Sequence, residues 1–291
     1  MCVAPGGVAS QSCGPRAPGA GLVLNTFSVR NHREASGMRI NEQVVLVTGG
    51  ARGLGVEIIR AFSREGALVV VNYRRSEDAA TDLVRELGSG RAVALRADVT
   101  DDDEVRGLFD AARAHFGRPI STVVNNALAD FEFNGDARPR PETLTWEDFD
   151  SQLRGAVKAT LATTQAALPG MREAGFGRIV NIGTNLFQHP VVPYHDYTAA
   201  KAAALSLTRT LATDLGPDGI TVNMVSGGLL RTTDASAATP EEVFDIIASG
   251  TPLRRVITPA ELADAVLFFA SPWARAVTGQ NLIVDGGLVK G

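Results

Sequence analysis

Residues 48–55 read Thr-Gly-Gly-Ala-Arg-Gly-Leu-Gly, and this glycine-rich stretch decides the fold. It follows the apolar run at residues 43–47, which is typical of a strand buried on both faces. It precedes residues 56–62, whose apolar positions recur at helical spacing. Glycine permits a tight turn and lets backbone N–H groups approach a pyrophosphate, whose charge the start of the helix attracts. The order of strand, glycine loop and helix therefore indicates a dinucleotide-binding site.

The alternation of apolar strands and helices continues to the end of the chain. Further strands are expected at residues 67–71, 92–97, 121–125, 178–183, 220–225 and 281–284. Helices are expected at 76–87, from 100 onward, within 146–173, over 198–215, and near 240–249 and 259–270. Strands that alternate with helices of this length indicate a parallel sheet. We therefore predict an α/β fold with one domain over residues 38–291, a doubly wound Rossmann-type sheet of about seven strands with helices on both faces.

The composition excludes several classes of protein. The residues are 45% hydrophobic and 21% charged, which is enough to build a core, and the net charge of −4 argues against broad neutralisation of nucleic-acid phosphates. No apolar stretch reaches the roughly 18 residues that a spanning helix needs. The two cysteines, Cys2 and Cys13, precede the predicted domain, and the four histidines show no metal-ligand spacing. We expect a cytoplasmic protein without a metal, a nucleic-acid partner or a membrane partner.

Residues 1–37 differ from the rest of the chain. They are rich in Gly, Pro, Ala and Ser, carry no acid before Glu34, and show neither helical nor strand periodicity. We interpret them as a disordered extension or as the product of a start assigned upstream of Met38. The alternative is a transit peptide, because the segment contains Arg and Ser and few acids.

A second motif lies 142 residues beyond the glycine loop. Tyr197-Thr198-Ala199-Ala200-Lys201 places a phenol and an ammonium group four residues apart on one helical face. A neighbouring ammonium favours the phenolate and lowers the pKa of a phenol from about 10. Such a tyrosine can give a proton to a carbonyl oxygen while hydride reaches the carbonyl carbon.

Together these motifs resemble the short-chain dehydrogenase/reductase family over residues 42–290. The glycines are spaced Gly-x-x-x-Gly-x-Gly, not Gly-x-Gly-x-x-Gly as in other Rossmann dehydrogenases. Residues 278–287 resemble most the branch of bacterial β-ketoacyl-[acyl-carrier-protein] reductases. The resemblance implies a nicotinamide cofactor and a homotetramer.

The end of the second strand indicates which nicotinamide cofactor binds. An NAD site has an acid there that binds the ribose 2′-hydroxyl, but this chain has no carboxylate between Asn72 and Glu77. Arg74, Arg75 and Arg52 can instead surround a 2′-phosphate, which pairs well with guanidinium groups. We therefore expect NADP(H). The residues expected to bind it are Gly49, Arg52, Gly53, Leu54, Gly55, Asn72, Arg74, Arg75, Asp98, Val99, Asn125, Ala127, Tyr197, Lys201, Leu230 and Thr232.

The expected catalytic residues are Tyr197, Lys201 and Thr184. The family has a serine 13 residues before the tyrosine, and Thr184 keeps its hydroxyl there with a stiffer side chain. An ungapped alignment puts Ala156 where the family has a catalytic asparagine, whose main-chain carbonyl is understood to hold a water. Aligning Gln152 instead needs an insertion of four residues.

Two further departures concern loops. Leu128 stands where the family has glycine after Asn125-Asn126-Ala127, and Gly227 stands where it has proline, which frees φ and is expected to loosen that turn. Asn185 is an alternative donor to the substrate oxygen. Residues 233–250 would form a substrate lid.

The leading expectation is the NADPH-dependent reduction of a ketone, such as a 3-oxoacyl thioester, to a secondary alcohol. One alternative is an NAD(P)-dependent alcohol dehydrogenase for a sugar, a steroid or another secondary metabolite. Another is a sensor that binds NADP without turnover, which the departures permit and the intact Tyr197 and Lys201 argue against. An acyl carrier protein would be the partner of a thioester substrate. Substrate choice is expected to lie in the lid and in the long aromatic loop at residues 128–145.

Overall fold

The computed structural model describes residues 37–290 apart from positions 129, 130, 132, 232, 234, 235 and 238. The expected N-terminal extension therefore lies outside the described residues, except for Gly37. The described residues belong to one compact unit, in agreement with the predicted single domain. None of the described helices is long and apolar enough to cross a membrane.

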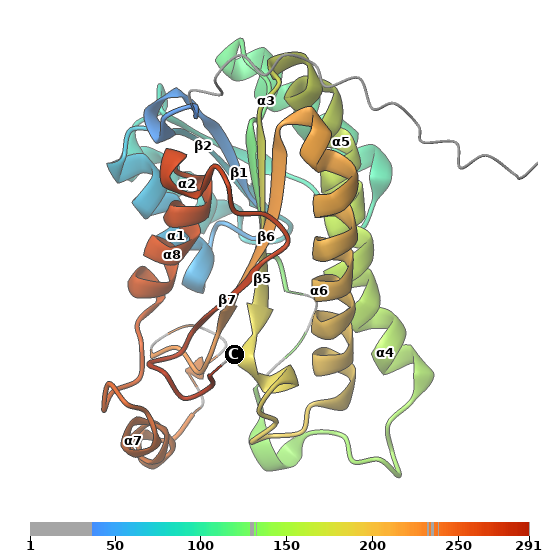
Figure 1. The fold of residues 1–291 in the computed structure, drawn as a ribbon, viewed down its shortest axis with the longest axis vertical. Coiled ribbons are helices and arrows are strands. Elements are labelled where there is room, and N and C mark those ends of the chain that lie inside the picture. The colour runs from blue at the N-terminus through green and yellow to red at the C-terminus, as the bar shows by residue number, and fades with distance from the viewer. Residues whose placement is uncertain are drawn as a thin grey trace, which may run out of the picture. The chain divides into compact units, whose positions relative to one another are not determined.

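A parallel sheet of seven strands forms the centre of the domain (Figure 1). The strands are β1 (Val44–Val47), β2 (Leu68–Tyr73), β3 (Ala92–Arg96), β4 (Thr122–Asn125), β5 (Gly177–Thr184), β6 (Ile220–Gly227) and β7 (Asn281–Val284). Their order in the sheet is β3-β2-β1-β4-β5-β6-β7, and every neighbouring pair is parallel. The chain moves outward from β1 in one direction and from β4 in the other. The predicted doubly wound sheet is therefore confirmed, with its switch point between β1 and β4.

Helices cover both faces of the sheet. They are α1 (Gly53–Arg64), α2 (Glu77–Leu87), α3 (Asp102–Phe116), α4 (Trp146–Leu153), α5 (Ala159–Ala174), α6 (His195–Leu215), α7 (Glu241–Gly250) and α8 (Pro259–Ala270). Helices α1, α2 and α8 lie on one face, and α3, α5 and α6 lie on the other (Figure 1).

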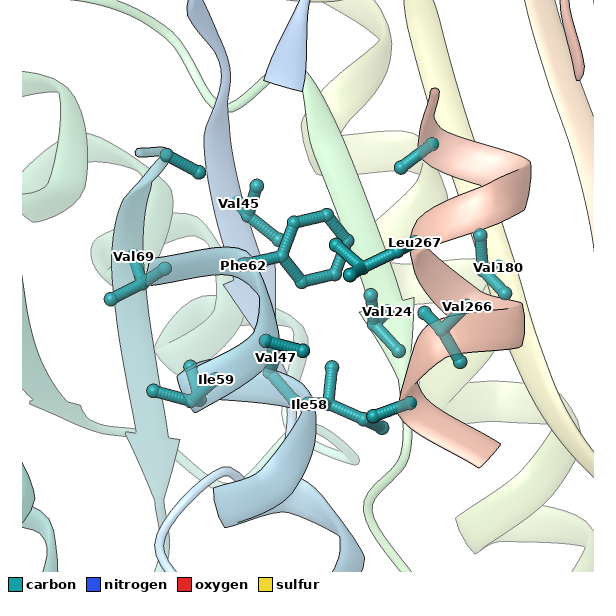
Figure 2. Close-up of a cluster of buried hydrophobic side chains, with 14 of the residues drawn as sticks. Val45, Val47, Ile58, Ile59, Phe62, Val69, Val124, Val180, Val266 and Leu267 are labelled. Carbon is teal, nitrogen blue, oxygen red and sulfur yellow. The ribbon is translucent and has the colours of Figure 1, made fainter. Parts of the chain in front are cut away.

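Strand β1 is apolar at every position because both of its faces are buried. Successive side chains of a strand point to opposite faces of the sheet. Val45 and Val47 pack with α1 and α8, and Phe62 of α1 is fully buried among them (Figure 2). Val44 and Leu46 point the other way, into a second core that α3, α5 and α6 cover. Both faces of β1 are dry, so a polar residue at any of these four positions would be buried.

The helix predicted within residues 146–173 is interrupted. Helix α4 begins at Trp146, and the hydroxyl of the preceding Thr145 accepts a hydrogen bond from Asp148 N. The helix continues into a π-helical segment at Arg154–Lys158 before α5 starts. A π segment accommodates extra residues within a helix and is frequent at functional sites.

Gly55 is required by close packing of the glycine loop. Gly49 and Gly53 have φ of +60° and +50°, which residues with a side chain rarely adopt. At Gly55 the φ is ordinary, but a Cβ would overlap the Gly49 carbonyl oxygen and lie 2.9 Å from Gly50 Cα and from Asn126 Nδ2. Helix α1 thus begins directly against the loop backbone.

We expect Gly55→Ala to lower the free energy of unfolding by about 1–3 kcal/mol, because backbone atoms cannot give way to the new methyl group. Urea denaturation measures this. The control is Gly107→Ala in α3, where a Cβ meets no atom within 4 Å. That exchange should stabilise the protein by about 0.5–1 kcal/mol, since alanine is the better helix former. Equal effects at both positions would contradict the packing argument.

Candidate active site

The predicted site residues meet at the carboxyl ends of the strands. The glycine loop follows β1, Asn125-Asn126-Ala127 ends β4, and Thr184 ends β5. These are the strands beside the switch point, where the crevice of a doubly wound sheet binds its ligand.

The segment that follows β4 is hydrogen-bonded to the glycine loop. The Thr48 hydroxyl accepts hydrogen bonds from Asn126 N and Ala127 N, both at 2.9 Å. The Asn126 amide donates to the carbonyl oxygens of Thr48 and Gly49 at 3.0 and 3.2 Å. Helix α1 begins at Gly53, and the side chain of the preceding residue, Arg52, makes no hydrogen bond that caps the helix. Gly55 N donates to Arg52 O at 3.0 Å, whereas Arg52 caps none of the other N–H groups of the first turn, which can therefore face an anion.

Asn72 supports the loop from the other side. Its side chain is buried, its Oδ1 accepts from Gly49 N at 3.2 Å, and its Nδ2 donates to Ala97 O at 3.1 Å. The amide thus joins β2, β3 and the loop. Gly53 and Leu54 form the first turn of α1, where Leu54 is partly buried against the core.

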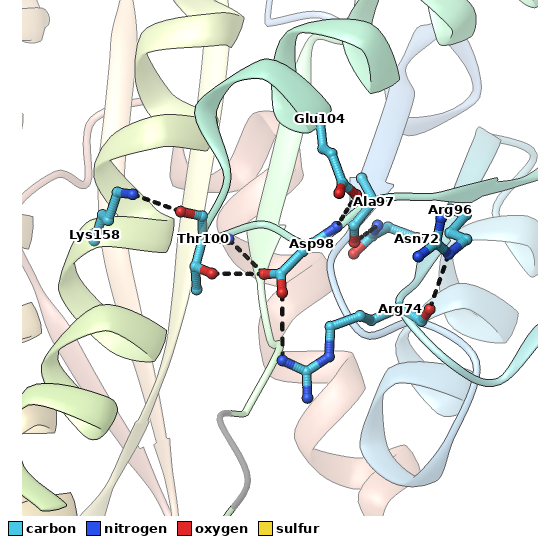
Figure 3. A network of polar contacts seen from close by, with 8 residues as sticks. All are labelled: Asn72, Arg74, Arg96, Ala97, Asp98, Thr100, Glu104 and Lys158. Carbon is cyan, nitrogen blue, oxygen red and sulfur yellow. Dashed lines mark hydrogen bonds and ion pairs between the residues drawn. The ribbon is translucent and has the colours of Figure 1, made fainter. Parts of the chain in front are cut away.

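Arg74 and Asp98 lie side by side at the ends of β2 and β3 (Figure 3). Arg74 Nη1 is 3.4 Å from Asp98 Oδ2, and the two side chains are 38% and 30% exposed. Burial by itself would raise the pKa of Asp98, but hydrogen bonds from Thr100 N and Oγ1 and the charge of Arg74 outweigh it and lower that pKa. Asp98 is therefore an ionised group that positions the Arg74 guanidinium.

The other residues predicted around the cofactor occupy different environments. Arg52 and Arg75 are exposed at the start of α1 and beyond β2. Val99 is buried beside α3 and α5. Leu230 forms a parallel bridge with Ile257. Thr232 lies outside the described residues.

Asn125 takes part in a buried chain of hydrogen bonds beneath the site. Thr163 of α5 donates to Asn125 Oδ1 at 2.7 Å, and Asn125 Nδ2 donates to Asn181 Oδ1 at 2.8 Å. Asn181 Nδ2 donates in turn to Thr208 Oγ1 of α6 at 2.8 Å. This chain links β4 and β5 to the two helices that flank the reactive residues.

Tyr197, Lys201 and Thr184 come together as predicted. Tyr197 is 5% exposed, and burial raises its pKa to about 12, although its hydrogen bond with Thr184 acts in the opposite direction. Lys201 Nζ donates to Ile182 O at 2.7 Å and lies 5.8 Å from the centre of the Tyr197 ring. Burial lowers the pKa of Lys201 to about 8.

The expected lowering of the Tyr197 pKa is therefore wrong for the protein without ligands. Desolvation raises the pKa of Tyr197 more than the contact with Thr184 lowers it. The phenol is a neutral proton donor over the physiological pH range, and the neighbouring Lys201 is close to its own titration point.

Aromatic side chains cover Tyr197. The ring of Phe131 stacks on that of Tyr197 with centroids 4.5 Å apart and planes at 15°, and Phe133 meets the same ring edge-on at 5.6 Å. Tyr194 contacts both phenylalanines, and its hydroxyl accepts a hydrogen bond from Gly135 N at 2.8 Å. The loop that the sequence marked as aromatic thus reaches the reactive tyrosine. Asp130 and Glu132 of this loop lie outside the described residues.

Asn185 and Gly227 differ from their expected roles. Asn185 is buried and donates to Asp285 Oδ2 at 2.9 Å, so its amide joins the site to the residue after β7. Gly227 continues β6 and pairs with Thr184 on one side and Val284 on the other. The expected loosening of this turn is not observed, because Gly227 is buried within the sheet. A Cβ at Gly227 would be 2.5 Å from Leu262 Cδ1, so a larger residue there would require that leucine side chain to move.

Comparison with known proteins agrees with this geometry. The family model described as Enoyl-(Acyl carrier protein) reductase matches residues 49–289. The 7alpha-hydroxysteroid dehydrogenase of Escherichia coli K12 is 32% identical over 255 residues, which cover 87% of this chain and 96% of that protein. Versicolorin reductase stcU of Emericella nidulans is 34% identical over 263 residues, 86% of this chain and 96% of the relative. A putative ketoacyl reductase of Streptomyces coelicolor is 34% identical over 261 residues, 85% and 97% of the two chains.

The chain belongs to the short-chain dehydrogenase/reductase family. It is an oxidoreductase that acts on ketone or alcohol groups with a nicotinamide cofactor, NAD or NADP.

Lys201 is expected to make the stability of the protein without cofactor rise with pH. Its pKa falls from 10.5, the ordinary value, to about 8 on folding. Between these values the unfolded chain binds more protons than the folded chain, so stability rises with pH. Tyr197 acts in the opposite direction above pH 10, because its pKa rises on folding from 10 to about 12.

Urea denaturation from pH 7 to 10 measures this effect. The difference in unfolding free energy between the wild type and Lys201→Met should change by about 1–3 kcal/mol over this range. Lys290→Met, at an exposed position, is the control and should leave the slope unchanged. Parallel curves for the wild type and Lys201→Met would contradict the assignment.

Proposed function

We propose that this protein reduces a ketone to a secondary alcohol with NADPH, and that Tyr197 donates the proton. The observation that carries the proposal is the buried phenol of Tyr197, which lies near Thr184 and with its ring centre 5.8 Å from Lys201 Nζ. A binding protein has no need for a buried phenol and a buried lysine in one place, since both cost desolvation energy. This argues against the sensor function.

The residues present fit a dinucleotide. Gly49 and Gly55 leave the loop backbone bare, and the first turn of α1 has no side-chain cap. These N–H groups would hold the pyrophosphate. When bound, the reduced nicotinamide supplies hydride to the carbonyl carbon.

The chain's own residues would then handle the oxygen. The Thr184 hydroxyl orients the ketone oxygen, and the neutral Tyr197 phenol gives it a proton. The Lys201 cation favours the phenolate that remains. The Phe131 ring keeps water off the face of Tyr197.

Arg74 supports NADPH over NADH. The end of β2 presents a guanidinium with no carboxylate before Glu77, and Asp98 orients it. In an NAD site a carboxylate at this position would accept a hydrogen bond from the ribose 2′-hydroxyl. Arg52 and Arg75 are the further cations proposed to face the 2′-phosphate.

For the substrate we propose two candidates. A 3-oxoacyl thioester, with an acyl carrier protein as partner, is suggested by the relative named as a putative ketoacyl reductase. A ring ketone or its alcohol, such as a steroid or another secondary metabolite, is suggested by the hydroxysteroid dehydrogenase and the versicolorin reductase. The rings of Phe131 and Phe133 next to Tyr197 favour the second candidate, because they offer flat apolar surfaces to a rigid ring.

One assay separates these functions. NADPH or NADH oxidation at 340 nm is followed with a 3-oxoacyl thioester, a ring ketone and an open-chain ketone, and the reverse reaction is followed with the matching alcohols. Turnover of the ring ketone alone supports the second candidate. Binding of NADPH without turnover of any compound would favour the sensor.

The organisation of the whole protein is also proposed. We infer that residues 38–291 form the catalytic domain, that residues 1–37 are an extension outside it, and that the protein acts in the cytoplasm. A homotetramer is proposed from the resemblance of residues 278–287 to family members.

Tyr197→Phe removes the transferable proton and keeps the ring that Phe131 contacts. We expect kcat to fall about 100-fold or more, while the Kd for NADPH changes little. Stopped-flow turnover and fluorescence titration measure the two quantities. Full activity in this variant would remove Tyr197 from its proposed role.

Arg74→Ala should weaken NADPH binding by about 1–3 kcal/mol and leave NADH binding nearly unchanged, because only the 2′-phosphate pairs with the guanidinium. Titration with each cofactor tests this. Arg106→Ala on α3, an exposed arginine in another ion pair, is the control. Equal weakening of both cofactors would assign Arg74 to the shared part of the dinucleotide or to the fold.

A further inference from the structure

Asp285 is a buried carboxylate that the proposed reaction does not use. It follows β7 directly and is 6% exposed. Its oxygens accept hydrogen bonds from Gly287 N at 2.9 Å, Val289 N at 3.0 Å and Asn185 Nδ2 at 2.9 Å. Burying a carboxylate costs free energy unless such bonds compensate it. The two backbone bonds fix the turn after β7, whereas the third reaches the residue next to Thr184.

The register of the sheet explains how this third bond forms. Thr184, Gly227 and Val284 are paired across the neighbouring strands β5, β6 and β7. Asn185 and Asp285 are the residues that come next after β5 and after β7. Strands β5 and β7 are not neighbours, so the hydrogen bond between the two side chains spans the position that comes next after β6.

Gly228 occupies that intervening position and leaves room for the contact. A Cβ there would lie 3.0 Å from Asp285 Cβ and 3.1 Å from Asn185 Nδ2. Both separations are shorter than ordinary van der Waals contact, so a side chain at this position would push against the carboxylate and the amide. The glycine and the pair on either side of it therefore form one arrangement.

Asn185 also begins the turn that contacts the hydroxyl of Thr184. Residues Asn185–Phe187 form a single 3₁₀ turn, and Leu186 N donates to Thr184 Oγ1 at 3.3 Å. This bond occupies a lone pair of the oxygen and leaves the O–H group to donate to a ketone oxygen. The direction of the O–H group thus depends on where the turn lies. The amide of Asn185, which is 4% exposed, ties the turn to the end of β7.

We propose that Asn185 and Asp285 are a pair of positioning residues that act through Thr184. The backbone after β7 fixes the carboxylate, the carboxylate holds the amide, and the amide holds the turn that orients the Thr184 hydroxyl. A carboxylate accepts hydrogen bonds without donating any, so it also determines which end of the amide faces it. The effect on catalysis rests on the proposed function, whereas the contact and the position of Thr184 do not.

Exchanging the two side chains tests the contact without any activity. Asn185→Asp should lower the urea midpoint, because it brings two carboxylates together, and Asp285→Asn should lower it, because an N–H group replaces an acceptor. The double variant restores one amide and one carboxylate, so its midpoint should lie above that of Asn185→Asp. A midpoint lowered by the sum of the two single effects would show that the side chains act independently, and it overturns the contact.

Crystal structures of the wild type and of Asn185→Leu test the positioning. Leucine resembles asparagine in shape but has no amide, so Thr184 Oγ1 should be displaced or should occupy a second rotamer. An unchanged Thr184 overturns the proposal. Asn223→Leu is the matched control, because Asn223 is fully buried and its amide also bonds two backbone groups of the segment before β7. This exchange should destabilise the protein and leave Thr184 in place. Asp285→Asn replaces Asn185→Leu if the latter does not fold.

The kinetic test uses the ketone that the wild type reduces best. Asn185→Leu should lower kcat about tenfold and leave the KM for the ketone and the Kd for NADPH unchanged, since the hydroxyl bonds most strongly to the charge that develops in the transition state. In Thr184→Val that hydroxyl is absent, so adding Asn185→Leu should lower kcat by no more than about twofold.

An unchanged kcat in Asn185→Leu, or a second tenfold loss in the Thr184→Val background, would overturn the action through Thr184. Asn223→Leu should retain the kcat of the wild type. If the wild type reduces no ketone, the proposed function fails, and the exchange variants and crystal structures still decide whether Asn185 and Asp285 position Thr184.

Discussion

The contact between the start of α1 and the backbone of the glycine loop is the constraint on which the site depends. Because Gly55 has no side chain, the helix can begin against Gly49 and Gly50. The first turn of α1, which has no side-chain cap, then lies at the switch point. The amides of Asn72 and Asn126 hold the loop in that position from β2 and β4. The anion site is therefore made by backbone, and the neighbouring strands determine its shape.

The charge states of the reactive residues depend on their burial. Tyr197 and Lys201 are buried without a carboxylate among the residues lining the spaces around them. Desolvation raises the pKa of Tyr197 and lowers that of Lys201, so both groups are pushed toward their neutral forms. Neutral hydrogen-bonding groups surround them, including the chain from Thr163 through Asn125 and Asn181. Such groups position the pair without fixing its charge, so a bound ligand can shift its protonation state.

Much of the site could be predicted from local sequence. Tyr197 and Lys201 are four residues apart, as expected for neighbours on one face of a helix. Thr184, 13 residues before Tyr197, lies near the phenol as the sequence predicted. The direction of the Tyr197 pKa could not be predicted in the same way, because it depends on how much water the surrounding residues exclude. The hydrogen bond of the Asn185 amide could not be predicted either, since its partner Asp285 lies 100 residues further along the sequence. Gly227 was expected to loosen a turn, but it belongs to a strand whose neighbours come from two distant segments.

The sequence by itself determined the α/β class, the order of strands and helices, and the position of the glycine loop, because these follow from periodicity and from backbone freedom within short segments. Only the tertiary structure decided which polar side chains serve the site and which serve the fold. Asn72, Asn125 and Asn185 are all short amides near the strand ends, yet each is engaged with protein groups from a distant segment. The packing of helices and strands decides which residues become such partners. The local sequence around each asparagine does not show which distant segment will lie beside it.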